Sequence, residues 1–325
     1  MQLLWILLGI AGFLTIAVLL ISYICFRMAF YVPDRKPPVG DTIDIPQGKI
    51  YEPFRASMER WTHEVRAMPH EDMSITSFDG LTLRGKYYEF APGAPIELMF
   101  PGYRGHAERD LSGGVQRCFR LGRSALIVNQ RASADSDGNV ISFGINEHRD
   151  CLTWVDFMLQ RFGPDVKIIL TGISMGASTV LMAGGKVLPP NVIGILADCG
   201  YSSAREIIQK VIGQMGLPVK ASYPFVKLGA KLYGHFDLEE TSPAQMLQNC
   251  TVPVISFHGE SDDYVPCYMS KANYEACSAK KRLVTVPGAG HGLSYPVAPE
   301  EYLNALREFF GPDASYAKQE ETNDV

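Results

Sequence analysis

The sequence has no block of basic residues and little net charge. Lys and Arg number 30 against 35 Asp and Glu, which gives a formal net charge of −5 at pH 7. A protein whose main partner is nucleic acid carries clustered positive charge, because that charge neutralises the phosphates. The charge balance therefore argues against nucleic acid as a partner.

Paired cysteines are also missing. The seven cysteines lie at positions 25, 118, 151, 199, 250, 267 and 277; they form no C-x-x-C motif, and their number is odd. This disfavours a disulfide framework and a zinc site. Several of the cysteines lie in or beside apolar runs, where a free thiol behaves as a small hydrophobic side chain. We expect reduced, structural cysteines.

Charged side chains are absent from residues 1–26, and Arg27 is the first to appear. A run of about 20 apolar residues is long enough to cross a bilayer as a helix. Trp5 and Tyr23 lie near the two ends of the run, where interfacial aromatic residues are expected. We predict a transmembrane anchor over residues 1–28, with residues 3–26 in the lipid bilayer.

Two alternatives to an anchor are weaker. A cleaved signal peptide has a basic first segment, a shorter apolar core and a small-x-small cleavage site, whereas this run lacks the basic segment and is followed by the poor site "FRMAFYV". A buried core helix fits badly with a terminal segment that is apolar on all sides. Because Arg27, Arg35 and Lys36 follow the span, the positive-inside tendency places the rest of the chain in the cytoplasm.

The next segment, residues 29–50, is predicted to be a linker. It holds Pro33, Pro37, Pro38 and Pro46 with Gly40 and Gly48, and such residues interrupt regular structure. Residues 52–68 then show helical spacing. Residues 73–90 alternate between apolar and polar on both sides of Asp79-Gly80, which predicts a β-hairpin.

From residue 96 onward, strand-like and helix-like segments alternate. The predicted strands are residues 96–102, 124–130, 166–172, 192–200, 252–260 and 282–288, and the clearest helical stripes are residues 147–163 and 300–310. Short apolar strands of this kind suit a parallel sheet covered on both faces. The chain is therefore predicted to be of the α/β class. Its domain spans residues 51–311, and residues 312–325 form a disordered polar tail.

Residues 201–250 interrupt this alternation, because they separate two strands by more than a normal loop. Two helix-like runs lie there, with Pro218 between them. We predict a small helical cap insertion over the carboxyl edge of the sheet. An ordinary crossover with one extra helix is the alternative.

The pentapeptide Gly172–Gly176, "GISMG", follows one of the apolar strands and precedes a run of small residues. G-x-S-x-G alone is a weak signal, but this setting is that of a nucleophile elbow, in which a serine occupies a strained strand-to-helix turn. We predict that Ser174 is a catalytic nucleophile.

A serine nucleophile needs a base, and on such a fold the acid and the histidine follow it in that order, each after a strand. Asp262 lies in "HGESDDYVP" just after a strand, and His291 lies in the glycine-rich "GAGHG" after the last strand. Both occur in the required order. Asp263 is an alternative acid, and His258 is expected to support the loop. The other histidines, expected to be surface or structural, are His63, His70, His106, His148 and His235.

The oxyanion of an acyl-transfer intermediate needs two hydrogen-bond donors. One predicted donor is the backbone N–H of Met175, directly after the nucleophile. The other is Tyr103 in "PGYRGHAERD", through its N–H or through its hydroxyl. The alternative for this loop is a glycine-rich turn that merely joins a strand to a helix.

These motifs carry a family resemblance over residues 73–311. The chain resembles α/β-hydrolases of the serine-hydrolase type, close to bacterial serine aminopeptidase-like and prolyl-oligopeptidase-like hydrolases. The matching motifs are "GYRGH", "NQRASADSDG", "GISMG", "HGESDDYVP" and "GAGHG". The sequence departs from the usual family pattern in two loops near the expected site. It has Pro101-Gly102 where related hydrolases often have His-Gly, and residues 129–134 stand where they often have Asp-x-Arg-Gly-His-Gly.

The sequence as a whole predicts a membrane-anchored serine hydrolase that cleaves acyl esters and needs no metal or organic cofactor. A peptidase acting on short peptides and an acyltransferase use the same chemistry and remain open. A catalytically silent binding protein on the same scaffold is the alternative from another class.

Overall fold

An eight-stranded sheet forms the centre of the structure, a computed structural model that describes residues 1–33 and 42–316. The strand order is β1-β2-β4-β3-β5-β6-β7-β8. The strands are β1 (Glu71–Thr76), β2 (Thr82–Tyr88), β3 (Ile96–Phe100), β4 (Ser124–Val128), β5 (Ile168–Ile173), β6 (Val192–Asp198), β7 (Val254–Gly259) and β8 (Lys281–Val286). The β1–β2 hairpin pairs antiparallel with β4, and the other pairs are parallel.

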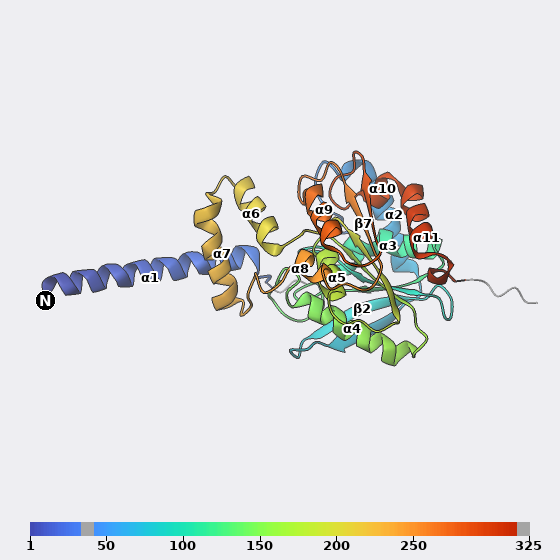
Figure 1. The fold of residues 1–325 in the computed structure, drawn as a ribbon, viewed down its shortest axis with the longest axis horizontal. Helices are drawn as coiled ribbons and strands as arrows, with labels where there is room; N and C mark the ends of the chain where they lie inside the picture. The colour runs from blue at the N-terminus through green and yellow to red at the C-terminus, as the bar shows by residue number, and fades with distance from the viewer. Residues whose placement is uncertain (34–41, 317–325) are drawn as a thin grey trace, which may run out of the picture.

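Helices cover both faces of the sheet (Figure 1). On one face, α4 (Glu147–Phe162) and α5 (Met175–Gly184) pack against the strands; on the other lie α2 (Arg55–Ala67), α3 (Ala107–Arg120) and α11 (Pro299–Phe310). All residues of β3 and β4 are buried, as expected for strands covered on both sides. The predicted α/β class is confirmed.

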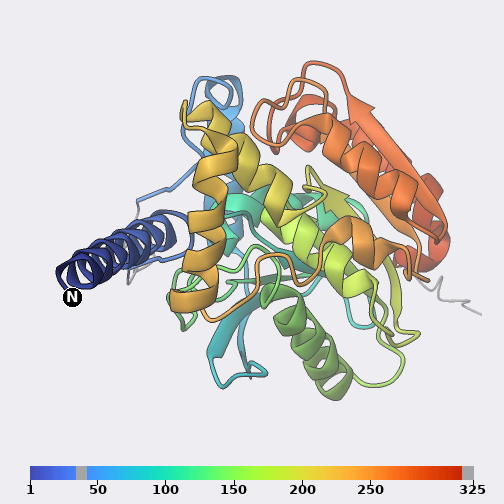
Figure 2. The same cartoon turned by 60° about the vertical axis from the view of Figure 1, so that its left-hand side comes forward.

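The insertion at residues 201–250 forms three helices: α6 (Ala204–Gln214), α7 (Val219–Tyr233) and α8 (Pro243–Leu247). Helix α7 crosses the long first helix, α1 (Gln2–Ala29), at a steep angle (Figures 1 and 2). The two backbones touch, because a Cβ on Gly229 would lie 2.4 Å from the carbonyl oxygen of Ser22. The insertion therefore holds the end of the first helix.

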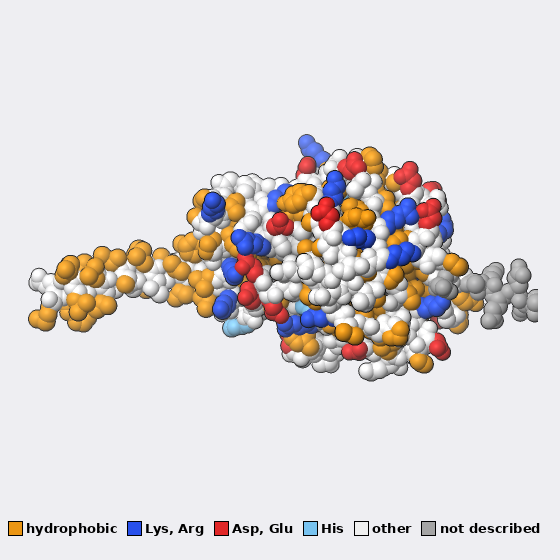
Figure 3. Space-filling view, viewed as in Figure 1, with side chains coloured by type: hydrophobic (Ala, Val, Ile, Leu, Met, Phe, Trp, Pro, Cys, Tyr) orange, Lys and Arg blue, Asp and Glu red, His pale blue; other side chains and the backbone are white. Residues whose placement is uncertain are grey.

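Among the described residues, one helix, α1, is both long enough and apolar enough to cross a membrane, by length and composition. Residues 3–16 of α1 are exposed and form an apolar rod that projects from the domain (Figure 3). Its last two turns differ, because Ser22 and Phe26 are buried, and Phe30, the residue directly after α1, is buried too. Phe26 and Phe30 pack in one cluster with Tyr223, Val226 and other residues of the insertion.

The expected linker is not a free tether where it is described. The backbone N–H of Val32 donates to Asn139, Tyr31 forms a bridge with Val140, and Ile45 is buried. Residues 34–41 of this predicted linker lie outside the described residues. The apolar side chains that flank the prolines, Val32 and Ile45, explain why the segment packs against the domain.

The predicted disordered tail also begins with ordered residues. A short helix, η2 (Pro312–Ala314), follows α11, and the buried Arg123 donates from Nε to the carbonyl of Ala314 at 2.6 Å. The N–H of Tyr316 donates to Gly122. Residues 317–325 of the predicted tail lie outside the described residues. A buried arginine needs acceptors, so it draws residues 312–316 onto the domain.

Candidate active site

Ser174 occupies a strained turn between β5 and α5. Its backbone angles are φ 56° and ψ −117°, a conformation that residues other than glycine rarely adopt. The N–H of Ser174 donates to the carbonyl of Asp198 at 2.8 Å, and α5 begins at the next residue, Met175. The turn presents the serine hydroxyl at the carboxyl edge of the sheet.

The two glycines of the pentapeptide make this turn possible. A Cβ on Gly172 would lie 2.2 Å from the backbone of Gly176, and a Cβ on Gly176 would lie 2.1 Å from the carbonyl oxygen of Phe100. No side chain fits at such separations without moving the backbone. The spacing of the G-x-S-x-G motif is therefore explained by close backbone packing on both sides of Ser174.

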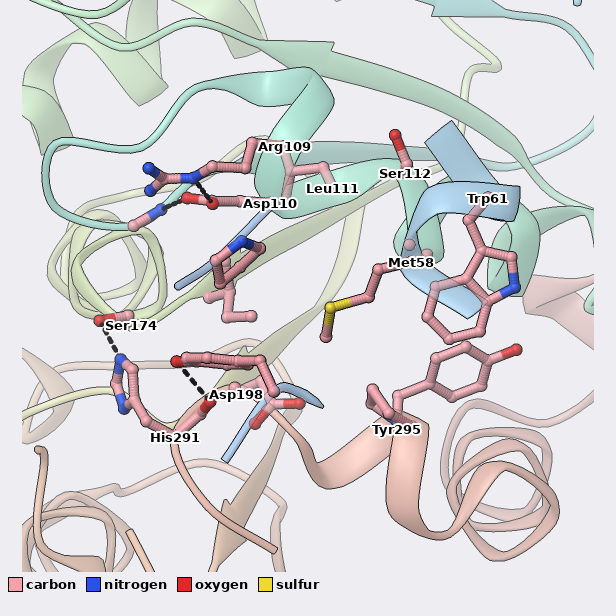
Figure 4. Close-up of a pocket in the computed structure, with 18 of the residues that line it drawn as sticks. Met58, Trp61, Arg109, Asp110, Leu111, Ser112, Ser174, Asp198, His291 and Tyr295 are labelled. Atoms are coloured by element: carbon pink, nitrogen blue, oxygen red, sulfur yellow. Dashed lines mark hydrogen bonds and ion pairs between the residues drawn. The ribbon is translucent and has the colours of Figure 1, made fainter. Parts of the chain in front are cut away.

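The structure brings Ser174, His291 and Asp262 together. His291 follows β8, and its Nε2 lies 2.9 Å from the Oγ of Ser174 (Figure 4). Asp262 follows β7, and its Oδ2 lies 2.7 Å from Nδ1 of His291. The backbone N–H groups of Tyr264 and Val265 donate to Oδ1 of Asp262 at 2.9 and 2.8 Å. These two bonds fix the carboxylate in the plane that His291 needs.

Asp262 rather than Asp263 faces the histidine. Asp262 is buried and Asp263 is exposed. Burial by itself raises the pKa of Asp262, but hydrogen bonds from His258 and His291 and from the amide of Val265 outweigh it and hold the pKa well below its usual range. The carboxylate is therefore ionised at neutral pH and stabilises positive charge on His291.

His258 is fully buried beneath this loop. Its Nδ1 lies 2.6 Å from the hydroxyl of Ser270, and its Nε2 lies 2.7 Å from the carbonyl of Val265 and 3.3 Å from Asp262. These contacts connect the loop after β7 to α9 (Cys267–Ala276). They fit the expected supporting role.

The two predicted oxyanion donors belong to segments that adjoin Ser174. Met175 is the first residue of α5, so its N–H has no partner within the helix. The loop after β3 lies against the serine, because a Cβ on Gly102 would be 3.5 Å from the Cβ of Ser174. The Tyr103 hydroxyl donates to the carbonyl of Ala29 at 2.7 Å. That bond directs the hydroxyl to α1.

Comparisons with known proteins agree with this architecture. No family model matches the chain. The uncharacterized protein YqkD of Bacillus subtilis is 27% identical over 190 residues, which cover 58% of this chain and 62% of that protein. The solved structure of the esterase Pf2001 of Pyrococcus furiosus superimposes with a TM-score of 0.63 at 20% identity and covers 86% of this chain and 97% of that one.

A puromycin-hydrolyzing peptidase of Mycobacterium tuberculosis superimposes with a TM-score of 0.60 at 16% identity, over 77% of this chain and 40% of that one. The chain has the α/β-hydrolase fold. The fold expected from the motifs is thereby confirmed. At these identities the likeness concerns the fold, so the roles of individual residues must be argued from the site itself.

A cavity of about 520 Å³ extends from Ser174 into the α/β-hydrolase domain. In Figure 4, Ser174 and His291 lie at one end of it and Trp61 and Tyr295 lie at the other, with Met58 between them. The N-terminal segment over residues 46–62 supplies much of the wall. None of the residues of the insertion at residues 201–250 lines this cavity.

The structure adds polar residues that the sequence did not single out. The Oδ2 of Asp110 accepts from the N–H of Gly102 at 2.9 Å. Gln130 donates to the carbonyl of Pro101 at 2.8 Å, and Ser133 donates to the carbonyl of Gly105 at 2.6 Å. Both lie in the segment that departs from the usual family pattern. Residues 129–134 therefore stabilise the loop after β3 through these two hydrogen bonds, although their sequence differs from the usual family pattern.

Cys199, Asp262 and His291 place their ligand atoms within 4.8 Å of one another, a separation that a metal ion would allow. Two of these atoms, on Asp262 and His291, already share a hydrogen bond. The hydrogen bonds of His291 to Ser174 and Asp262 account for the positions of two of the three side chains.

Proposed function

We propose that this chain is a serine hydrolase that cleaves acyl esters through Ser174, His291 and Asp262. The observation that carries the proposal is the unbroken chain of hydrogen bonds from the Ser174 hydroxyl through His291 to the Asp262 carboxylate. The Ser174 hydroxyl and His291 line a cavity. A serine hydroxyl is a weak nucleophile until a neighbouring base removes its proton, and this arrangement supplies that base.

In the proposed reaction, the Oγ of Ser174 attacks the acyl carbonyl carbon while Nε2 of His291 takes its proton. The N–H groups of Met175 and Tyr103 hold the oxyanion, and Asp262 stabilises the imidazolium. The imidazolium then protonates the leaving alkoxide, which departs as an alcohol. A water molecule, deprotonated by His291, attacks the acyl-enzyme, and Ser174 regains its proton as the carboxylic acid leaves.

The cavity supports an acyl group as the part of the substrate that is bound. The side chains of Trp61 and Tyr295 line its far end, and Met58 lies between them and Ser174. Burying apolar surface against such side chains gives roughly 25 cal/mol per Å² of binding free energy before ordering costs. A volume of about 520 Å³ lies within the range of small-molecule sites, roughly 300–1,000 Å³.

Cleavage of short peptides is the second candidate, and the fold it shares with the M. tuberculosis peptidase favours it. An aminopeptidase needs an acceptor for the charged amino terminus of its substrate. Among the described residues that line the cavity, the carboxylates are Asp110 and Asp198. Asp110 accepts from Gly102 and Arg109, and Asp198 from Ser294 and Tyr302. An ester, whose leaving group is also better, is therefore the favoured substrate.

A fluorophosphonate probe tests the nucleophile. The wild type is expected to be labelled and Ser174→Ala is not, because the probe bonds to an activated serine oxygen. Hydrolysis of p-nitrophenyl acyl esters should fall by at least about 10³-fold in the variant. Aminoacyl anilides assayed beside a graded ester series separate the esterase from the peptidase. A folded wild type that reacts with neither the probe nor any substrate would support the silent binding protein.

Neighbouring aspartates provide a matched pair for the acid. Asp262→Asn keeps an oxygen for the N–H groups of Tyr264 and Val265 but presents neutral NH₂ to His291. Its kcat for ester hydrolysis should fall on the order of 10³–10⁴-fold, since the imidazolium loses its counter-charge. Asp263→Asn removes an exposed carboxylate and should stay within about twofold of the wild type. Equal losses in both variants would contradict the assignment.

We also propose that α1 is retained as a membrane anchor. Phe26 and Phe30 are buried against the insertion, so cleavage after a signal peptide would expose their partners to water. Removing two buried aromatic side chains costs about 3–5 kcal/mol each. This favours an anchor over a cleaved signal. The positive charges at Arg27, Arg35 and Lys36 favour a cytoplasmic position for the hydrolase domain in this proposal.

Intact-mass measurement of the protein from the membrane fraction tests the anchor. The mass should include residues 1–28, and the protein should resist extraction by alkaline carbonate, because a transmembrane helix is not released by charge changes. Protease added to intact cells should leave the domain uncut if it faces the cytoplasm. A soluble product that begins near residue 30 would show a cleaved signal instead.

A further inference from the structure

The end of α1 contacts the loop after β3 that holds a candidate oxyanion donor. The hydroxyl of Tyr103 donates to the carbonyl of Ala29, the last residue of α1, at 2.7 Å. The guanidinium of Arg104 donates to the carbonyl of Met28 at 2.7 Å and to that of Tyr31 at 3.2 Å. Two consecutive residues of the loop are thus bound to the end of one helix.

These contacts provide hydrogen-bond donors for backbone carbonyls that have no partner within a helix. The last four carbonyls of an α-helix have no N–H partner within the helix, and together they carry partial negative charge. In α1, two of them, on Met28 and Ala29, are taken up by side chains of the loop. Arg104 also brings a positive charge to the negative end of the helix, which is its favourable position.

The loop itself adopts a conformation that needs support. Arg104 has φ 54°, which is unfavourable for a residue with a side chain. On either side of it, the loop is fixed by the domain, where Gly102 donates to Asp110 and Gly105 accepts from Ser133. Tyr103, between these fixed points, is held through its side chain by α1.

The end of α1 is rigid enough to serve as a support. Phe30 is fully buried and meets Phe143 edge-on at 5.7 Å between ring centroids. The ring of Tyr103 packs on the same Phe143 at 5.0 Å. The contact between Gly229 and Ser22 fixes the preceding turns of α1 against α7. One side of the last turn of α1, at Phe26, and the residue after the helix, Phe30, are therefore packed against the rest of the protein.

We propose that the last turn of α1 is a working part of the active site, in which Tyr103 and Arg104 are positioning residues. By binding the carbonyls of Met28 and Ala29, they hold the backbone N–H of Tyr103 against the oxyanion. The inference rests on the proposed hydrolase function. The helix that anchors the protein also completes the geometry of catalysis.

Full-length variants in detergent or nanodiscs test this. Tyr103→Phe keeps the ring and the backbone N–H but removes the bond to Ala29. Tyr233→Phe is the matched control, because it removes a hydroxyl bond from α7 to the carbonyl of Leu19, farther along the same helix. We expect kcat for an activated ester to fall at least about tenfold in Tyr103→Phe, with KM changed less than threefold, and to remain unchanged in Tyr233→Phe.

Arg104 gives an independent arm of the same test. Arg104→Ala should lower kcat at least about tenfold, and Arg104→Lys should recover part of the loss, since its ammonium group still donates to a helix carbonyl. A kcat equal to that of the wild type in both Tyr103→Phe and Arg104→Ala would overturn this inference but not the proposed hydrolase function. So would a loss of kcat matched by equal loss in Tyr233→Phe, because that indicates general loosening of α1. An inactive wild type would overturn the proposed function together with it.

Discussion

The strained turn at Ser174 is the constraint on which the rest of the site depends. Its backbone is tolerated because Gly172 and Gly176 let the chain pass within contact of itself and of β3. The turn projects the hydroxyl from the carboxyl end of β5. Since β7 and β8 run parallel to β5 in the same sheet, the loops that follow them end at the same edge and deliver Asp262 and His291 to that hydroxyl.

Much of this arrangement was predictable from the sequence, because it depends on local patterns and chain order. The apolar strands and the G-x-S-x-G pentapeptide located Ser174, and chain order placed Asp262 and His291 after later strands. The choice between Asp262 and Asp263 required the structure, since both occupy one loop. The Tyr103 hydroxyl also could not be assigned, because its acceptor, Ala29, is 74 residues away along the chain.

The packing partner of the insertion was not predictable from the sequence. Its helical runs and Pro218 were visible, but helical spacing does not say what a helix packs against. The close contact depends on Gly229, which in sequence is one glycine among 30. The insertion packs against α1, and much of the wall of the cavity comes from the segment around Met58 and Trp61. In this molecule the segment over residues 46–62 forms part of the wall of the site.

The most direct test of the account is the structure of the full-length protein after reaction with a fluorophosphonate. The account predicts a phosphorus atom bonded to Oγ of Ser174. It also predicts a phosphonyl oxygen about 2.7–3.1 Å from the backbone nitrogens of both Met175 and Tyr103. The Tyr103 hydroxyl should still be bound to Ala29. An adduct on another residue, or a phosphonyl oxygen directed away from both amides, would contradict the account.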